Sequence, residues 1–359
     1  MKRVFYLAMA FALGCGSVSA LAEEADPGYE AVAITKVYGD GQKVAAVALQ
    51  YGEEIDADSV EVADYQVTDY EITDVYVNSE AALTDENQGG CYVIVLLDTS
   101  ELSDDYNVDM SISPQGHEGG NTAPSEREAS AEEDEEESSE EDGEAFSGED
   151  AEEHSYPVSD ISSSNGLSNQ LSVSITQVGD VSSVSGTVYE GSDTAIETDY
   201  QENINLVVDE FEQDVYTSPD DENSTLMYNL YLPEGYSDEA EYPLVLFMPD
   251  ASADSSDPVK TLTQGLGAVI WAEEENQTEN PCIVLAPQYK NDTDSVENTM
   301  GLLAQIVETY SVDESRIYLA GQSAGTIRAI TLMIENPDTF AAALLVTGLA
   351  DDDYEERLS

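Results

Sequence analysis

The stretch Arg316-Ile317-Tyr318-Leu319-Ala320-Gly321-Gln322-Ser323-Ala324-Gly325, followed by a helix-like segment from residue 326 to 335, decides the fold. Its first half is an apolar run typical of a buried strand. The pattern G-x-S-x-G then indicates a sharp strand-to-helix bend that presents the serine. Small residues at Gly321 and Gly325 avoid a steric clash at such a bend. We therefore expect a strand, a tight turn that exposes the Ser323 hydroxyl, and a helix.

Three further apolar runs of strand length surround this stretch, at residues 244–248, 283–286 and 342–346, and an alternating run at 228–232 precedes them. Runs that are apolar on both faces belong in buried parallel sheets. Apolar residues recur at helical spacing between the later runs: Val296, Met300, Leu303, Ile306, Val307 and Tyr310, then Ile327, Ile330, Leu332 and Met333. Alternating strands and helices predict an α/β sheet with right-handed crossovers.

The amino-terminal half follows a β pattern. Short β-type runs at residues 31–38, 44–51, 65–68, 75–77 and 92–97 alternate with turns, including one at Asp40-Gly41, and similar runs return at 171–175, 184–189 and 204–208. This pattern predicts an antiparallel sandwich. The residues between 117 and 157 are mostly Glu, Asp, Ser and Gly, which predicts a disordered tract. Either the tract is an insertion within one β domain or it links two domains.

These patterns predict the following organisation: a signal peptide at 1–22, the first part of a β sandwich at 27–116, an acidic insertion or linker at 117–160, the second part of the sandwich at 161–223, and an α/β domain at 224–359. The signal peptide is indicated by Lys2-Arg3, an apolar core and Ala20-Leu21-Ala22. It predicts a secreted, periplasmic or cell-surface protein. Lipidation at Cys15 is an alternative. No later segment is long and apolar enough to cross a bilayer.

The chain is strongly acidic. Its 359 residues carry 77 acidic and 10 basic side chains, for a net charge of −67. Repulsion disfavours nucleic acid as a partner, and the charge favours a monomer. A solubilised exterior explains the charge better than calcium binding, because no EF-hand loop is present. No nucleotide loop, zinc spacing or haem motif appears, so no cofactor or metal is implied. Cys91 and Cys282 follow the signal, and their pairing stays open.

Several segments resemble secreted α/β-hydrolase esterases of the polyhydroxybutyrate-depolymerase and feruloyl-esterase type. The resemblance spans about residues 224–350 and lies in the motifs at 228–233, 242–247, 286–289, 316–323 and 336–342. The amino-terminal part is similar to the immunoglobulin-like domain that precedes some of these esterases. The resemblance implies an α/β-hydrolase fold, at least its amino-terminal half, behind an immunoglobulin-like sandwich. It also implies ester hydrolysis through a serine nucleophile, without a cofactor.

The resemblance assigns the nucleophile to Ser323 and one oxyanion donor to the amide of Ala324. The second donor normally comes from the loop after the first buried strand, which here reads Pro249-Asp250-Ala251-Ser252. Pro249 has no amide proton, so Ala251 or Asp250 would have to donate. The Asp250 carboxylate would oppose a developing negative charge unless it points away. A plain turn is the alternative interpretation of this loop.

A serine nucleophile needs a histidine that is oriented by a carboxylate, in the chain order serine, acid, histidine. The 36 residues after Ser323 contain no histidine, whereas His117 and His154 lie in or beside the acidic tract, and the acidic residues 351–353 have the character of a solvated turn. We therefore expect these 359 residues alone to be inactive. The sequence is expected to be a fragment of a longer reading frame; a natural truncation that lost catalysis is the alternative.

The leading hypothesis is a secreted serine hydrolase of carboxylic esters, which acts through an acyl-enzyme on Ser323. Its substrate would be acyl or feruloyl esters of polysaccharide, or a polyester. A serine peptidase on the same fold is one alternative, because the elbow does not distinguish esters from amides. A non-catalytic exported protein that binds carbohydrate or a cell surface through its β domain is the other.

Overall fold

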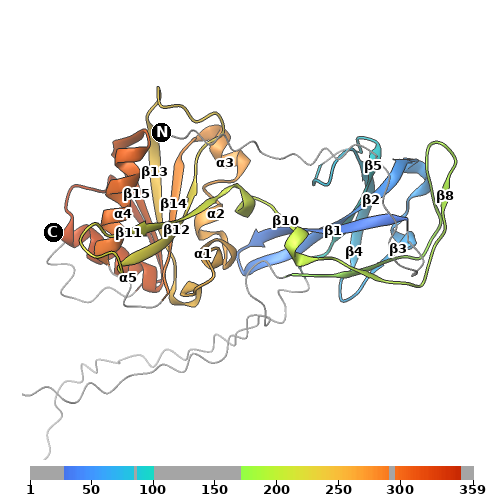
Figure 1. Cartoon of the computed structure of the whole chain (residues 1–359), viewed down its shortest axis with the longest axis horizontal. Helices are drawn as coiled ribbons and strands as arrows, with labels where there is room; N and C mark the ends of the chain where they lie inside the picture. Colours follow the sequence, from blue (N-terminus) through green and yellow to red (C-terminus); the bar gives the residue numbers. More distant parts are fainter. Residues whose placement is uncertain (1–27, 85–86, 101–170, 291–295, 349–359) are drawn as a thin grey trace, which may run out of the picture. The chain divides into compact units, whose positions relative to one another are not determined.

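The computed structural model describes residues 28–84, 87–100, 171–290 and 296–348, and all of these belong to one compact unit of the chain (Figure 1). The predicted signal peptide, the whole acidic tract at 117–160 with both histidines, and the acidic residues 351–353 lie outside the described residues. The predictions made for them therefore stay predictions.

The amino-terminal domain is built from β-strands. A five-stranded sheet has the order β10-β1-β2-β5-β4, and a three-stranded sheet has the order β3-β6-β9. The strands are β1 (Tyr29–Tyr38), β2 (Gly41–Ile55), β3 (Tyr65–Val67), β4 (Ile72–Asn78), β5 (Gly90–Leu97), β6 (Ser174–Gln177), β9 (Ile196–Glu197) and β10 (Ile204–Asn205). The first five confirm the strands predicted from residue 31 to 97. The β1–β2 hairpin turns at Gly39–Asp40, one residue earlier than predicted, because Tyr38 pairs with Gly41.

Two later strand predictions were partly wrong. Residues 183–187 form a turn that joins β7 (Val181–Ser182) to β8 (Val188–Tyr189), so only the last two residues of the run predicted at 184–189 lie in a strand. The Ser183 amide donates to the Thr187 carbonyl at 2.8 Å and closes this turn. The run at 204–208 leaves the sheet after β10 and enters the short 3-10 helix η5 (Val208–Glu210). In both places apolar residues alternate as in a strand, but the strand does not extend over the whole run. The Val184 amide donates to the Glu54 carbonyl at 2.8 Å, and the Leu206 amide donates to the Thr35 carbonyl at 3.0 Å.

Residues on both sides of the acidic tract contribute to the same sheets. In the smaller sheet, Gln66 of β3 is opposite Thr176 of β6. In the larger sheet, β10 runs parallel to β1, with Ile34 opposite Ile204. The buried core of the domain likewise contains Val47 and Val93 together with Ile175. The segment 101–170 therefore interrupts a single β domain.

A buried polar network joins the strands of this domain. The Gln177 side chain, at the end of β6, is 1 % exposed. Its Oε1 accepts from the Tyr51 hydroxyl at 2.8 Å, and its Nε2 donates to the carbonyls of Gly179 and Tyr189, both at 2.9 Å. The Tyr51 hydroxyl also lies 3.0 Å from that of Tyr65. Burial raises the pKa of both tyrosines above the usual value.

The carboxyl-terminal domain is an α/β unit around a six-stranded sheet of order β11-β12-β14-β13-β15-β16. Its strands are β11 (Glu212–Thr217), β12 (Thr225–Tyr231), β13 (Tyr242–Met248), β14 (Ile283–Gln288), β15 (Val312–Gln322) and β16 (Ala342–Val346). The four neighbouring strands β14, β13, β15 and β16 are parallel to one another. Strand β12 is antiparallel to β14, and β11 is antiparallel to β12. The apolar runs thus form the predicted parallel sheet. The edge strand β11 was not predicted, because only Tyr216 of its residues is buried.

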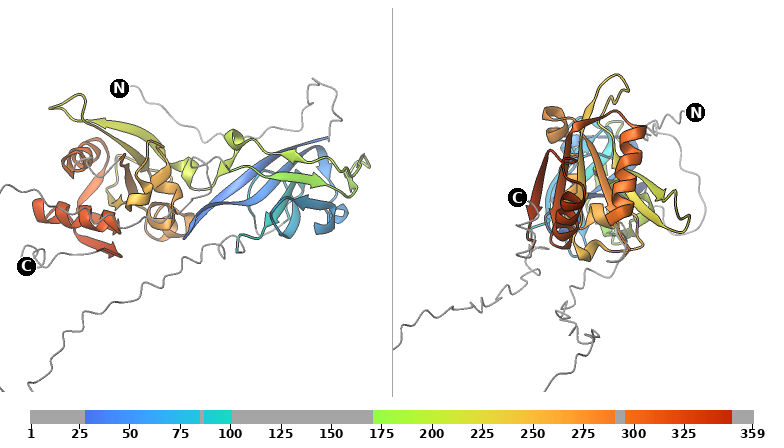
Figure 2. Two further views of the ribbon diagram at one scale, coloured as in Figure 1. Left: turned by 90° about the horizontal axis from the view of Figure 1, so that it is seen from below. Right: turned by 90° about the vertical axis from the view of Figure 1, so that its left-hand side faces the viewer.

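Helices lie on both faces of this sheet (Figures 1 and 2). The helices α4 (Val296–Thr309) and α5 (Ala324–Glu335) confirm the two predicted helices and bury Leu302, Ile306 and Leu332 against one face. The helices α1 (Lys260–Thr263), α2 (Leu266–Val269) and α3 (Glu274–Glu279) lie toward the other face, where Leu262 and Val269 are buried. These three helices were not predicted, because elements of four to six residues are too short to show a helical repeat.

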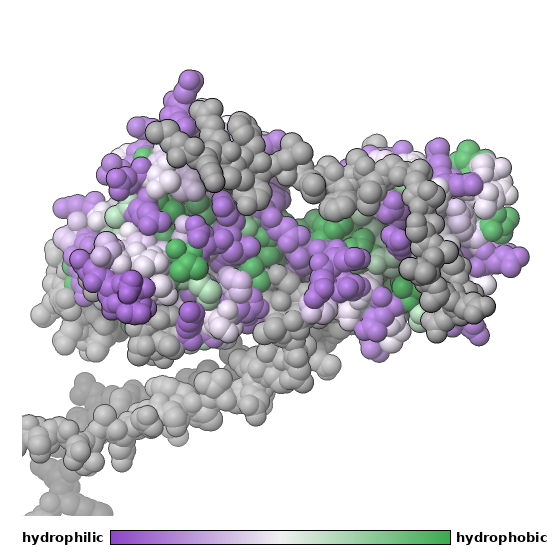
Figure 3. Space-filling view, in the orientation of Figure 1, coloured by the Kyte–Doolittle hydropathy of each residue, from purple (hydrophilic) through white to green (hydrophobic). Residues whose placement is uncertain are grey.

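Hydrophilic residues dominate the face shown in Figure 3, where hydrophobic residues lie in small groups. In the edge strand β16, all five apolar residues are exposed. Cys91 and Cys282 are both buried and form no disulfide with each other. They belong to different hydrophobic clusters. No helix within the described ranges has the length and hydrophobicity that a bilayer crossing requires.

Candidate active site

The predicted bend occurs at Ser323, between the last residue of β15 and the first residue of α5. Ser323 has φ 50° and ψ −116°, a conformation that L-residues rarely adopt and that costs about 1–3 kcal/mol. Two backbone hydrogen bonds of 2.9 Å hold it, from the Ser323 amide to the Val346 carbonyl and from the Thr326 amide to the Ser323 carbonyl. The Ser323 side chain is exposed. A strained backbone thus presents a hydroxyl at the surface.

The two glycines of the motif allow this bend. A Cβ at Gly325 would lie 2.0 Å from the Met248 carbonyl oxygen and 2.5 Å from that of Pro249. A Cβ at Gly321 would lie 2.9 Å from the Gly325 carbonyl oxygen. All three oxygens belong to the backbone, which cannot move aside as a flexible side chain would. The glycines therefore let the start of α5 approach the end of β13.

The loop after β13 lies beside the bend. In the parallel pairing of β13 with β15, Met248 is opposite Gly321, so residues 249–253 and Ser323 leave the sheet at the same edge. The loop continues into the 3-10 turn η6 (Ala251–Ala253). The Gln322 side chain bridges the two segments, because its Nε2 donates to Asp250 Oδ2 at 3.3 Å. The structure thus brings together the segments that contain Ser323, Ala324 and Ala251.

The Asp250 carboxylate is engaged within its own loop. Its Oδ1 accepts from the Ser252 amide at 2.6 Å and so caps η6, while Oδ2 accepts from Gln322. Two donors therefore offset its charge. Ala251 and Ala324 are the first residues of η6 and α5, and amides at this position have no partner within their own helix. Such amides are suited to donate to an anion.

A buried glutamine secures this loop, and sequence reasoning did not identify it. Gln288, the last residue of β14, is fully buried. Its Nε2 donates to the Ala253 carbonyl at 2.7 Å and to that of Ser255 at 3.3 Å. Its Oε1 accepts from the amide and the hydroxyl of Thr261, at 2.8 and 2.9 Å. A polar residue directly after a buried apolar run was the available signal in the sequence.

An ion pair also contacts the loop. Arg328 Nη2 of α5 lies 2.9 Å from Asp254 Oδ2, and each side chain is 11 % exposed. The Arg328 guanidinium carbon lies 4.5 Å from the centre of the Tyr289 ring. Sequence reasoning missed this pair, because the two residues are 74 positions apart. Only the fold brings them together.

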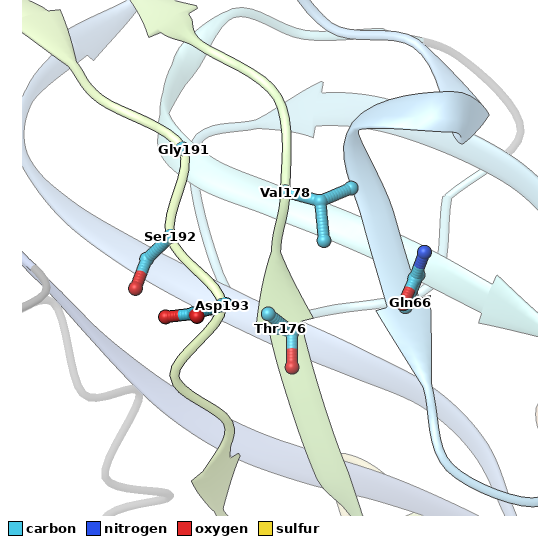
Figure 4. Close-up of a pocket in the computed structure, with 6 residues that line it drawn as sticks. All are labelled: Gln66, Thr176, Val178, Gly191, Ser192 and Asp193. Atoms are coloured by element: carbon cyan, nitrogen blue, oxygen red, sulfur yellow. The ribbon is translucent and has the colours of Figure 1, made fainter.

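The described surface includes an apolar hollow beside the bend and a larger one in the β domain. A small apolar one, of about 160 Å³, adjoins the bend; it is lined by Gly321 and Gln322 together with Phe247, Leu266, Gly267, Ile270, Trp271, Ala320, Leu344 and Val346. A larger one, of about 660 Å³, lies in the β domain (Figure 4). It is lined by Gln66, Thr176, Val178, Gly191, Ser192 and Asp193. Aromatic rings, on which sugars commonly stack, are absent from this lining.

Neither a histidine nor a metal centre accompanies Ser323 within the described ranges. Both histidines of the chain lie outside them. Within those ranges, no group of three or more His, Cys, Asp or Glu side chains could hold a metal ion. The described part of the site therefore presents an exposed serine hydroxyl beside the first amides of η6 and α5, and no histidine lies among its residues.

Comparisons with known proteins agree with this architecture. Residues 30–190 match the family described as the esterase Ig-like N-terminal domain. A thermostable esterase shares the fold at 23 % identity and a TM-score of 0.67, with 91 % of this chain and 80 % of that chain covered. No curated protein matches the chain.

Two further solved structures align with smaller parts of the chain. A CE1 ferulic acid esterase from Anaeromyces mucronatus has 16 % identity and a TM-score of 0.31, over 40 % of this chain and 65 % of that one. A post-proline cleaving enzyme from Rickettsia typhi has 10 % identity and a TM-score of 0.32, and the alignment covers 51 % of this chain and 27 % of that one. The chain thus resembles esterases with an immunoglobulin-like N-terminal domain, and it has that domain followed by an α/β-hydrolase fold.

Proposed function

We propose that this protein is an exported serine hydrolase of carboxylic esters, with Ser323 as its nucleophile. The observation that carries the proposal is the strained, exposed Ser323 between β15 and the first amide of α5. Strain of this kind persists only where the surrounding structure enforces it, and it concentrates at functional sites. The G-x-S-x-G bend on an α/β-hydrolase sheet is the arrangement in which a serine attacks a carbonyl.

The reaction would proceed in two halves. Ser323 Oγ attacks the ester carbonyl carbon and passes its proton to a general base, and a tetrahedral oxyanion forms. The amides of Ala324 and Ala251 donate to that oxyanion. The carbon–oxygen bond to the alcohol then breaks, the alcohol leaves with the proton from the base, and an acyl-enzyme remains. Water releases the acid by the same steps. The apolar hollow at Gly321 and Gln322 would accommodate an apolar part of the substrate.

The substrate class follows from the resemblance and from the site together. We propose acyl or feruloyl esters attached to polysaccharide, or a polyester, because these are the substrates that the resemblance implies. The amide donors and the hydroxyl do not distinguish an ester from an amide, so a serine peptidase is the second candidate. An ester needs less activation of its leaving group than an amide, which favours the first candidate.

The test is the Ser323→Ala variant of the protein expressed from its complete reading frame. We expect hydrolysis of p-nitrophenyl butyrate to fall at least about 1,000-fold, because the acyl-enzyme can no longer form. Ser315→Ala is the matched control, since Ser315 lies near the opposite end of β15 and its hydroxyl donates to Asp313. Activity that survives Ser323→Ala would show the assignment to be wrong. Faster cleavage of an aminoacyl anilide than of the ester would favour the peptidase.

A further inference from the structure

Arg328 contacts both ends of the loop that carries the Ala251 amide. Its Nη2 donates to both carboxylate oxygens of Asp254, at 2.9 and 3.3 Å, and its Nη1 donates to the Pro249 carbonyl at 3.5 Å. Arg328 itself lies on α5, five residues after Ser323. A single side chain thus connects the helix that follows the nucleophile to residues 249 and 254 of the neighbouring loop.

The guanidinium is held in place from its other side by an aromatic ring. It lies 4.5 Å from the centre of the Tyr289 ring, within the range of a cation–π contact. Tyr289 is buried, and its hydroxyl lies 2.7 Å from Thr299 Oγ1. The Tyr289 carbonyl accepts from the Ser255 amide at 2.8 Å, so this residue also contacts the end of the loop. The orientation of Arg328 is therefore determined by a packed ring and not by solvent.

The ion pair also controls charge near the bend. Asp254 closes η6 through its amide, which donates to the Ala251 carbonyl at 3.1 Å. An unpaired carboxylate at this point would disfavour a negative charge on a bound substrate. Arg328 neutralises Asp254, in a chain that has only 10 basic residues against 77 acidic ones. A planar guanidinium can stack on the ring and bind the carboxylate at the same time, which lysine cannot do equally well.

We propose that Arg328 is a positioning residue, which holds residues 249–254 against α5 so that the Ala251 amide faces the same point as the Ala324 amide. This inference rests on the proposed function. It assigns no contact between Arg328 and the substrate. Arg328 acts through Asp254 and Pro249, and the quantity it controls is the position of one oxyanion donor.

The test measures kcat and KM for p-nitrophenyl butyrate in the protein from its complete reading frame. We expect Arg328→Met to lower kcat about 10- to 100-fold with little change in KM, because a displaced donor weakens mainly the transition state. Arg328→Lys should lower kcat by a smaller factor. In the Arg328→Met background, Asp254→Asn should restore part of kcat, since it removes the unpaired carboxylate. Arg316→Met, which breaks the exposed pair with Asp313 on β15, is the control and should leave kcat unchanged.

The outcomes separate this inference from the proposed function. A folded Arg328→Met variant with the wild-type kcat overturns the inference, and so does a variant that loses thermal stability but keeps its kcat. If Arg328→Met does not fold, Arg328→Lys and Asp254→Asn decide in its place by the same criterion. Survival of activity in Ser323→Ala overturns the proposed function itself, whatever the Arg328 variants show.

Discussion

Each domain ends one central strand in a buried glutamine, but the two glutamines serve different surroundings. Gln177 at the end of β6 binds a tyrosine hydroxyl and two carbonyls. Gln288 at the end of β14 binds Thr261 and the carbonyls of Ala253 and Ser255. Each amide group uses both its oxygen and its nitrogen, and both side chains are almost fully buried.

The difference lies in what surrounds each network. The residues around Gln177 are buried tyrosines and strand backbone, so that network closes the core of the β domain. The network around Gln288 holds a loop next to a strained, exposed serine. A buried polar network is therefore not by itself a mark of function. The combination with backbone strain and an exposed nucleophile distinguishes the second network from the first.

The largest expected effect comes from closing the space at Gly325. In a helix, Gly→Ala would ordinarily stabilise by about 1 kcal/mol. Here the new Cβ would lie 2.0 Å from the Met248 carbonyl oxygen, so we expect Gly325→Ala to destabilise by about 1–3 kcal/mol or more and to remove most activity. Urea unfolding and ester hydrolysis measure the two effects. Gly39→Ala is the control, because nothing lies within 4 Å of its Cβ position.

The matched pair Gln288→Leu and Gln177→Leu tests the comparison directly. Each variant leaves buried partners without a hydrogen bond, at about 1–3 kcal/mol for each group left unsatisfied. We therefore expect both variants to lose free energy of unfolding, and Gln288→Leu to lose at least as much as Gln177→Leu, because the Gln288 side chain makes more hydrogen bonds. Only Gln288→Leu should also lower kcat of the folded protein, because the loop with Ala251 loses its support. Equal kcat values in the two variants would contradict the distinction drawn between the networks.

The smallest expected effect at neutral pH is that of the buried tyrosines on the free energy of unfolding. This effect increases as the pH rises above 10. Folding raises the pKa of Tyr51 and Tyr65, mainly through burial. Below pH 10 both states keep these phenols neutral. Above pH 10 the unfolded chain loses their protons and the folded chain does not, so the free energy of unfolding falls by about 1.4 kcal/mol per pH unit for each tyrosine. Tyr51→Phe should reduce this slope.

This alkaline effect acts in both domains. The network around Gln177 includes the phenol of Tyr51, whereas the side chains of Gln288 and Thr261 have no titrating group. In the α/β domain the pKa of Tyr231 rises to about 12, through burial and the nearby Glu210. Trp271, the single tryptophan, lies in that domain and reports its unfolding by fluorescence. A slope unchanged in Tyr51→Phe would contradict the assignment to this tyrosine.

Local sequence determined the strands and the bend. A run of apolar residues marks each buried strand in the sequence. The bend requires glycine at 321 and 325, because neighbouring backbone leaves no room for a Cβ. The apolar runs and the G-x-S-x-G spacing can be read within a few residues, whereas the crowding at Gly325 comes from Met248 and Pro249 in the folded chain. The strand predicted at 184–189 failed because alternation describes which side chains are apolar and not which backbone groups pair. The short helices α1, α2 and α3 escaped prediction because each is shorter than two turns.

Tertiary structure decided what supports the bend. The contact of Gln322 with Asp250, the carbonyls bound by Gln288 and the pairing of Arg328 with Asp254 join residues between 33 and 74 positions apart. No local pattern specifies such partners, because they meet only when parallel strands align their carboxyl ends at one edge of the sheet. The sequence by itself therefore identified the bend and the serine that it presents, whereas the residues that hold the neighbouring loop were identified only in the folded chain.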